Sequence, residues 1–132
     1  MKTAWSNRVE ECRALFARER EQKIRREIAE KLTDGLVLDV GCGTKELEKH
    51  LKNHEYIGLD LTREFKPTIQ ADAHMLPFRS NSIPNVCTKN VLQHLSDYKK
   101  ALEEIIRVSS DTVVLAERIH NQPTRIVYAD PV

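Results

Sequence analysis

Cysteine and long apolar runs are scarce in this sequence of 132 residues. Its three cysteines, Cys12, Cys42 and Cys87, are odd in number and share no Cys-x-x-Cys spacing, so neither a disulfide framework nor a thiolate zinc site is expected. No apolar run approaches the roughly 20 residues that span a bilayer, and the first five residues lack the apolar stretch of a secretory signal. These absences argue against a membrane protein and predict a cytoplasmic location.

An excess of charge of either sign is also lacking. The formal net charge is +1, so the chain has no global field that would attract nucleic acid or an anionic membrane. Hydrophobic residues make up 40% and charged residues 31% of the sequence, which is typical of a globular domain. We therefore predict a single domain over residues 1–132. Its partners must be identified from its sites, and RNA is possible but not indicated.

The first 34 residues predict a helical extension, as one long helix or two short ones divided near Glu19 and Arg20. Apolar residues recur at helical spacing, at Trp5, Val9, Cys12, Phe16, Ile24, Ile28 and Leu32. Acidic residues stand four positions before basic ones, as in Glu21 and Arg25, which favours a solvated helix face. The basic cluster Lys23, Arg25 and Arg26 belongs to that face, with contact to RNA as the alternative.

From residue 36 the pattern predicts strands that alternate with helices. The expected strands cover 36–38, 56–59, 68–71, 84–88 and 112–116, and the expected helices cover 45–52 and, after a cap at Ser96 or Asp97, 97–108. On the second helix we expect Ala101, Leu102, Ile105 and Ile106 to face inward. Such alternation predicts a Rossmann-like, open and mostly parallel α/β sheet of about five strands. Ligands bind such sheets outside the carboxyl ends of the strands, where Asp39, Asp60 and Asp72 stand.

A glycine turn lies between the first of these strands and the helix after it. Gly41 and Gly43 allow a sharp turn there, and their amides could approach a ligand as an anion or carboxylate cradle. A dinucleotide fingerprint would require a third glycine where Glu46 stands, and no Gly-Lys-Ser/Thr triplet follows, so NAD and an ATP phosphate loop are both disfavoured. Asp60, at the end of the next strand, can accept hydrogen bonds from both ribose hydroxyls. Together these features predict an adenosine-bearing ligand without phosphates.

Four segments in register resemble the class I S-adenosylmethionine-dependent methyltransferases of the small-molecule type. They are Val37-Leu38-Asp39-Val40-Gly41-Cys42-Gly43-Thr44, Tyr56-Ile57-Gly58-Leu59-Asp60, Ala71-Asp72-Ala73-His74-Met75-Leu76-Pro77-Phe78 and Asn90-Val91-Leu92-Gln93-His94-Leu95. The resemblance implies S-adenosyl-L-methionine as cofactor and methyl transfer as the reaction.

The same resemblance implies a role for individual residues. The methionine end of the cofactor would be lined by Asp39, Gly41, Cys42 and Gly43, with Lys89 and Asn90 beside the amine and sulfonium. On the adenosine side, Asp60 would hold the ribose, Leu61 would pack on the adenine, and Asp72 and Ala73 would reach the adenine edge. His94 is a weak candidate for a general base. No metal is expected, because His50 and His54 have no third ligand.

The chain departs from the family pattern at three places. Lys45 replaces a further glycine, and we expect its long side chain to crowd the ligand. Ile83-Pro84-Asn85 replaces a Phe-Asp pair, which removes an acid and a backbone donor. We expect the last two strands of the fold to be missing, so that either the chain is a fragment or a homo-oligomer or partner subunit covers the open sheet edge.

Two functions therefore remain open on the sequence. The first is an S-adenosylmethionine-dependent methyltransferase whose acceptor is a small molecule, with tRNA or a protein side chain as alternatives. The second is a non-catalytic, methyltransferase-like binding or scaffold module that works with a partner subunit.

Overall fold

The computed structural model describes residues 3–118 and 125–129. It begins with one uninterrupted helix, α1 (Ala4–Lys31), so there is no division near Glu19. The Thr3 hydroxyl caps this helix by accepting a hydrogen bond from the Ser6 amide at 3.1 Å. Among the described residues, no helix is both long enough and apolar enough to cross a membrane.

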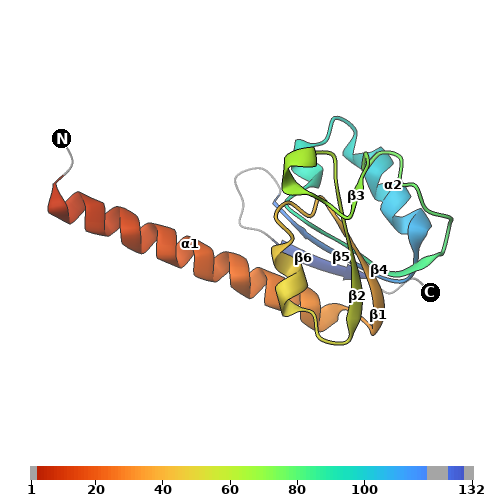
Figure 1. Cartoon of the computed structure of the whole chain (residues 1–132), viewed down its shortest axis with the longest axis horizontal. Helices are drawn as coiled ribbons and strands as arrows, with labels where there is room; N and C mark the ends of the chain where they lie inside the picture. Colours follow the sequence, from red (N-terminus) through yellow and green to blue (C-terminus); the bar gives the residue numbers. More distant parts are fainter. Residues whose placement is uncertain (1–2, 119–124, 130–132) are drawn as a thin grey trace.

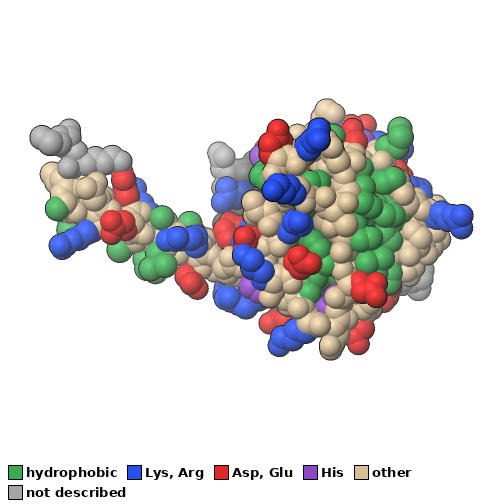
Figure 2. All heavy atoms as spheres, in the orientation of Figure 1, with side chains coloured by type: hydrophobic (Ala, Val, Ile, Leu, Met, Phe, Trp, Pro, Cys, Tyr) green, Lys and Arg blue, Asp and Glu red, His purple; other side chains and the backbone are tan. Residues whose placement is uncertain are grey.

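Only the second half of α1 packs on the rest of the chain. Ile28 and Leu32 are buried there and Ile24 packs against them. The first half projects from the domain as an arm, on which Trp5 and Phe16 are 74% and 67% exposed (Figure 1). Figure 2 shows hydrophobic and charged side chains intermixed along this arm. Residues 4–20 are called the α1 arm below.

Six strands form one sheet in the order β3-β2-β1-β4-β5-β6. The strands are β1 (Gly35–Val40), β2 (His54–Asp60), β3 (Ile69–Gln70), β4 (Ile83–Lys89), β5 (Ser109–Glu117) and β6 (Arg125–Ala129). The first five are parallel to their neighbours, with Leu38 of β1 paired with Ile57 and Val86, whereas β6 is antiparallel to β5. The predicted Rossmann-like α/β sheet is confirmed, and β6 adds a strand in a segment to which the sequence analysis assigned none.

Each face of the sheet has its own hydrophobic cluster, because side chains alternate along a strand. Leu38 and Val40 of β1 join the cluster under α2 (Tyr98–Val108). Val37, the residue before Leu38, joins the opposite cluster, which lies under α1 and the short helix η1 (Glu46–His50). Asp39 stands two residues after Val37, so its side chain lies on the same α1 face of the sheet, near the carboxyl edge. Figure 1 shows the two helices on either side of the strands.

Two helix predictions need correction. The helix expected over 45–52 is a single 3₁₀ turn, η1, preceded by Lys45 in the left-handed region at φ 62°. The second helix begins after its predicted cap, Asp97, but its inner face differs from the expected one. Ile106 is 56% exposed whereas Glu104 is buried, because the inward spacing runs through Ala101, Glu104, Ile105 and Val108.

Candidate functional site

Two cavities lie at the carboxyl edge of the sheet, and Gly41 lines both of them. The first, of about 320 Å³, lies on the α1 face, and Arg25, Asp39, Glu46 and Lys89 are among its lining residues; it is called the charged cavity below. The second, of about 390 Å³, is called the apolar cavity and is lined in part by Leu59, Leu61, Ala71 and Ala73. A ligand that occupies both must pass the glycine turn, as the sequence predicts.

Gly41 is required at this turn by both conformation and space. Its φ is +74°, and a Cβ there would lie 2.3 Å from Cγ2 of Val91. Gly43 also has a positive φ of +52°, but open space surrounds its Cα. The turn is held by the neighbouring strand: the Gly41 and Cys42 amides donate to the Leu59 carbonyl at 2.7 and 3.0 Å. The turn is therefore rigid, and its amides already have acceptors within the protein.

Asp39 is the buried acid of the charged cavity. Its Oδ2 accepts a hydrogen bond from the Tyr56 hydroxyl at 2.7 Å. Burial raises the pKa of the Asp39 carboxyl to about 7, against the lowering effects of the Tyr56 hydrogen bond and of Arg25. The same carboxyl and the burial of the phenol raise the pKa of Tyr56. Asp39 can therefore change its charge near neutral pH, which suits a group that meets a cationic ligand.

Two further acids line the apolar cavity. Asp60 holds the turn, because its Oδ2 accepts from the Gly43 amide and its Oδ1 from the Thr62 amide, both at 2.9 Å. Asp72 accepts two hydrogen bonds from His74, through the backbone amide at 2.9 Å and Nδ1 at 2.7 Å. These bonds lower the pKa of the Asp72 carboxyl, with the amide as the larger cause. Both carboxyl groups are thus oriented by their hydrogen bonds, and their remaining lone pairs can accept from a ligand.

The loop after β4 separates the two cavities and is fixed by Glu117 at the end of β5. This carboxylate accepts from the Thr88 hydroxyl at 2.7 Å and from the amides of Val91 and Leu92. Asn90 has a positive φ of 54° and donates its amide to the Ala116 carbonyl at 2.8 Å. The sequence analysis assigned no role to Glu117, because the contacts that it makes are between β5 and a loop about 25 residues earlier.

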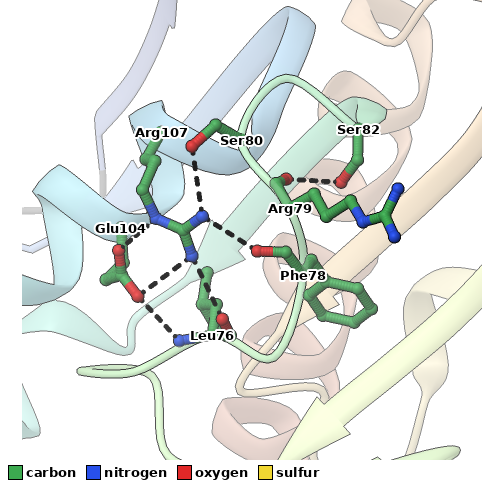
Figure 3. Close-up of polar contacts among 7 residues, drawn as sticks. All are labelled: Leu76, Phe78, Arg79, Ser80, Ser82, Glu104 and Arg107. Carbon is green, nitrogen blue, oxygen red and sulfur yellow. Dashed lines mark hydrogen bonds and ion pairs between the residues drawn. The ribbon is translucent and has the colours of Figure 1, made fainter.

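The segment that follows Asp72 is fastened to α2 by a partly buried ion pair between Glu104 and Arg107 (Figure 3). Glu104 accepts from the Leu76 amide at 3.0 Å and from Arg107, which lowers the pKa of its carboxyl. Arg107 also donates to the carbonyls of Leu76 and Phe78 at 3.1 and 2.9 Å. The wall of the apolar cavity is thereby connected to the packed helix, so the position of Asp72 does not depend on the loop alone.

Lys45 does not crowd the site as expected. Its Nζ donates to the Lys66 carbonyl at 2.9 Å, so the side chain extends across the surface toward the end of η2 (Arg63–Phe65). It lines neither cavity at this edge. The turn requires a left-handed backbone at this position, which glycine adopts easily and which Lys45 also adopts. The lysine side chain is tolerated because it points away from the two cavities.

Asn85, the other departure, is fully buried and has four hydrogen bonds. Its Oδ1 accepts from the Thr33 amide and hydroxyl at 2.9 and 3.0 Å, and its Nδ2 donates to the carbonyls of Thr33 and Leu36 at 2.8 and 3.2 Å. An aspartate in this place could not donate. The lost acid is therefore replaced by an amide that joins the end of α1 to β1 and β4.

With this geometry in hand, comparison with known proteins identifies the fold family. The methyltransferase domain family matches residues 38–116. The chain belongs to this family. MJ1252, an uncharacterized protein of Methanocaldococcus jannaschii, is 34% identical to this methyltransferase domain over 109 residues, which cover 74% of the chain and 43% of the relative. The chain thus spans less than half of that relative.

Solved structures share the fold of the methyltransferase domain. A candidate S-adenosyl-L-methionine-dependent methyltransferase from Methanococcus maripaludis aligns with a TM-score of 0.64 and 15% identity, over 71% of this chain and 53% of its own. The complex between the Haloferax volcanii Trm112 methyltransferase activator and a candidate methyltransferase aligns with a TM-score of 0.59 and 22% identity, over 76% and 56% of the two chains. At these identities the likeness concerns the fold alone.

The two cavities of the methyltransferase domain fit the two ends of S-adenosylmethionine, the cofactor that the family implies. The charged cavity contains both signs of charge, as the amino and carboxylate groups of methionine require. The apolar cavity offers leucine and alanine side chains to a ring, with Asp60 and Asp72 at its margin. Of the ten residues predicted to bind the cofactor, only Asn90 lines neither cavity.

The sequence analysis misplaced a charged residue of the site. It placed Arg25 on a solvated helix face, whereas Arg25 lines the charged cavity. Its spacing from Ile28, three residues later, was a usable signal, because the two positions are neighbours on a helix. Glu21, expected to pair with Arg25, instead forms an ion pair with Lys89 of β4.

His74, which is bonded to Asp72, and His94 line the apolar cavity, whereas His50 and His54 line neither of the two cavities. His94 is exposed. His50 bonds to Gln22 at 2.7 Å, and both ring nitrogens of His54 are buried without a partner among the described residues. No group of three potential metal ligands was found within residues 3–118 and 125–129.

Proposed function

We propose that this domain binds S-adenosyl-L-methionine across the two cavities and transfers its methyl group to an acceptor, with a small molecule as the first candidate. The observation that carries the proposal is the meeting of a charged and an apolar cavity at Gly41, on the edge where the strands of this fold end. When bound, the cofactor supplies a methyl group already activated by the sulfonium. The protein must therefore mainly hold and orient the reactants.

In this proposal each predicted residue has one task. Asp39 faces the methionine ammonium, and Gly41, Cys42 and Gly43 shape the turn beside it. On the other side, Asp60 accepts from the ribose hydroxyls, Leu61 covers the adenine, and Asp72 and Ala73 meet its edge. Lys89 and Asn90 fix the loop between the cavities. His94 would act as a base only if the acceptor keeps its proton until transfer.

The partner is also part of the proposal. One neighbour of similar fold is named as a complex with a methyltransferase activator. In this chain β3 has only two residues, and β6 is the outer strand on the opposite side among the described residues. We infer that a partner subunit or a second copy covers one of these edges in a cytoplasmic protein.

The first test is binding, by calorimetric titration with S-adenosylmethionine and S-adenosylhomocysteine. Leu61→Ser is the sharpest variant, because Leu61 is 65% exposed and its loss should not disturb folding. We expect it to weaken binding about fivefold or more, since covering part of a leucine contributes about 1 kcal/mol. Asp60→Ala should abolish measurable binding, with thermal unfolding recorded because Asp60 also holds the turn.

Met75→Ser is the matched control, since Met75 is 76% exposed and lines neither cavity. Its affinity should equal that of the unmodified protein. The absence of heat from either ligand would reject the cofactor proposal for this chain. Binding without transfer of a labelled methyl group to any supplied acceptor would favour the non-catalytic module instead.

A further inference from the structure

A carboxylate bound in the charged cavity needs hydrogen-bond donors, and the sequence predicts them at the amides of the glycine turn. The structure uses these amides elsewhere. Gly41 and Cys42 donate to the Leu59 carbonyl, and Gly43 donates to Asp60 at 2.9 Å. An amide has one proton and therefore one strong hydrogen bond to give. These three amides are therefore already used, and the cationic side chains that line the charged cavity are the donors of opposite charge for a carboxylate there.

Two cations line that cavity, and only one of them is already in an ion pair among the described residues. Lys89 is paired with Glu21, and its side chain is 17% exposed. Arg25 has no direct hydrogen bond or ion pair with any of the described residues. The remaining acid at the mouth, Glu46, bonds to Lys49 at 3.0 Å on the outer surface. The guanidinium of Arg25 and the buried carboxyl of Asp39 therefore line the same cavity and offer it groups of opposite charge.

This polarity matches an α-amino acid in one orientation. The ammonium of the ligand would meet Asp39, and its carboxylate would meet Arg25. The reverse orientation would bring two carboxylates together, and like charges at short range are repulsive. A guanidinium also suits the task because it binds a carboxylate through two parallel hydrogen bonds.

We propose that Arg25 of α1 binds the methionine carboxylate of the cofactor, so that α1 is a wall of the cofactor site and selects ligands with an intact amino acid end. The inference rests on the proposed cofactor, but it assigns a residue outside the glycine turn and the strand ends. It also explains why α1 is joined to the end of β4 through Glu21 and Lys89, since that ion pair holds the helix over the cavity.

The test compares S-adenosylmethionine with its decarboxylated analogue, which lacks only the carboxylate. Both are titrated calorimetrically into the unmodified protein, Arg25→Gln, Arg25→Lys and Arg26→Gln. Glutamine keeps the helix propensity of arginine, so folding should be preserved. Arg26 is the matched control, because it is the next residue of the same helix and does not line the charged cavity.

We expect Arg25→Gln to weaken S-adenosylmethionine binding about tenfold or more, as loss of a charged hydrogen-bonded pair does. Binding of the decarboxylated analogue should stay the same, so the variant loses the preference of the unmodified protein for the carboxylate. Arg25→Lys should recover part of the preference, and Arg26→Gln should retain it fully.

Three outcomes would overturn the assignment, and they differ from failure of the proposed function. Unchanged S-adenosylmethionine binding by Arg25→Gln excludes a role in affinity, and equal weakening of both ligands indicates a structural role instead. Equal affinity of the unmodified protein for both ligands shows that the carboxylate is not recognised. If neither ligand binds the unmodified protein, the cofactor proposal itself fails.

Discussion

Asp39 shows how one residue can couple the site to pH. Its carboxyl lies on the α1 face of β1, under the Tyr56 hydroxyl, and burial raises its pKa to about 7. The free domain therefore contains a mixture of the neutral and charged forms near neutral pH. A ligand ammonium would favour the charged form, so proton release should accompany binding.

We expect affinity for S-adenosylmethionine to rise as the pH increases from 5 to 7, by up to about tenfold per unit, and then to level off. Asp39→Asn should bind more weakly above pH 7 and lose this slope. Stability should change in the opposite direction. Because the folded pKa exceeds the unfolded value of 3.8, the folded state holds more protons, and its stability falls as pH rises from about 4 to 7.

Calorimetric titration at four pH values, together with thermal unfolding of both proteins, measures the two slopes. The comparison is between the unmodified protein and Asp39→Asn, so other titrating groups cancel. An affinity that is flat between pH 5 and 7 in the unmodified protein would contradict the role given to Asp39.

At the scale of elements, the strands were predictable and the pairing between distant elements was not. The apolar run before Asp39 and the one before Asp60 each mark a buried parallel strand, and the structure confirms both. Glu104 was not expected inside, because a charged residue is buried only where partners such as Arg107 and the Leu76 amide stabilise its carboxylate. The pairing of β6 with β5 depends on a contact that no local pattern reports.

The lining of the two cavities was predictable to a similar degree. Motifs located the turn and the strand-end acids, since these residues follow one another in register along the chain. Arg25 lies outside those motifs, and its position over the cavity depends on how α1 packs on the sheet. The spacing of apolar residues predicts which face of a helix is buried, but it does not predict which cavity of the folded domain that face covers.

Asn85 is the residue that fastens one element to two others. Its side-chain amide donates to the carbonyls of Thr33, after α1, and of Leu36 in β1, and its Oδ1 accepts from Thr33, whose hydroxyl also donates to Asp111 at 2.8 Å. We expect Asn85→Asp to reduce the free energy of unfolding by about 2–4 kcal/mol, because it removes two donated bonds and turns a buried charge toward carbonyl oxygens.

Denaturant unfolding at pH 7 measures the loss. Asn53→Asp makes the same change at an exposed position, so its free energy of unfolding should differ by no more than about 0.5 kcal/mol. Equal stability of Asn85→Asp and the unmodified protein would show that the four hydrogen bonds contribute nothing net.

At the scale of the whole molecule, α1 contacts the domain only through its second half. The core contacts of α1 begin at Ile24, and its site contacts are made by Glu21 and Arg25. Before that point the side chains of residues 10–16 are all exposed, and Figure 1 shows the arm extending away from the sheet. The arm therefore has no visible part in the core or the site.

We expect removal of residues 1–19 to leave the thermal midpoint within a few degrees and the affinity for S-adenosylmethionine unchanged within about threefold, because all packing and site residues of α1 remain. Removal of residues 1–27 should lower both, since it deletes Ile24 and Arg25 and leaves Lys89 without Glu21. Thermal unfolding and titration of the two shortened chains separate these cases. A large loss on the shorter removal would mean that the arm packs on the domain in solution, since only residues outside the described core and site would have been lost.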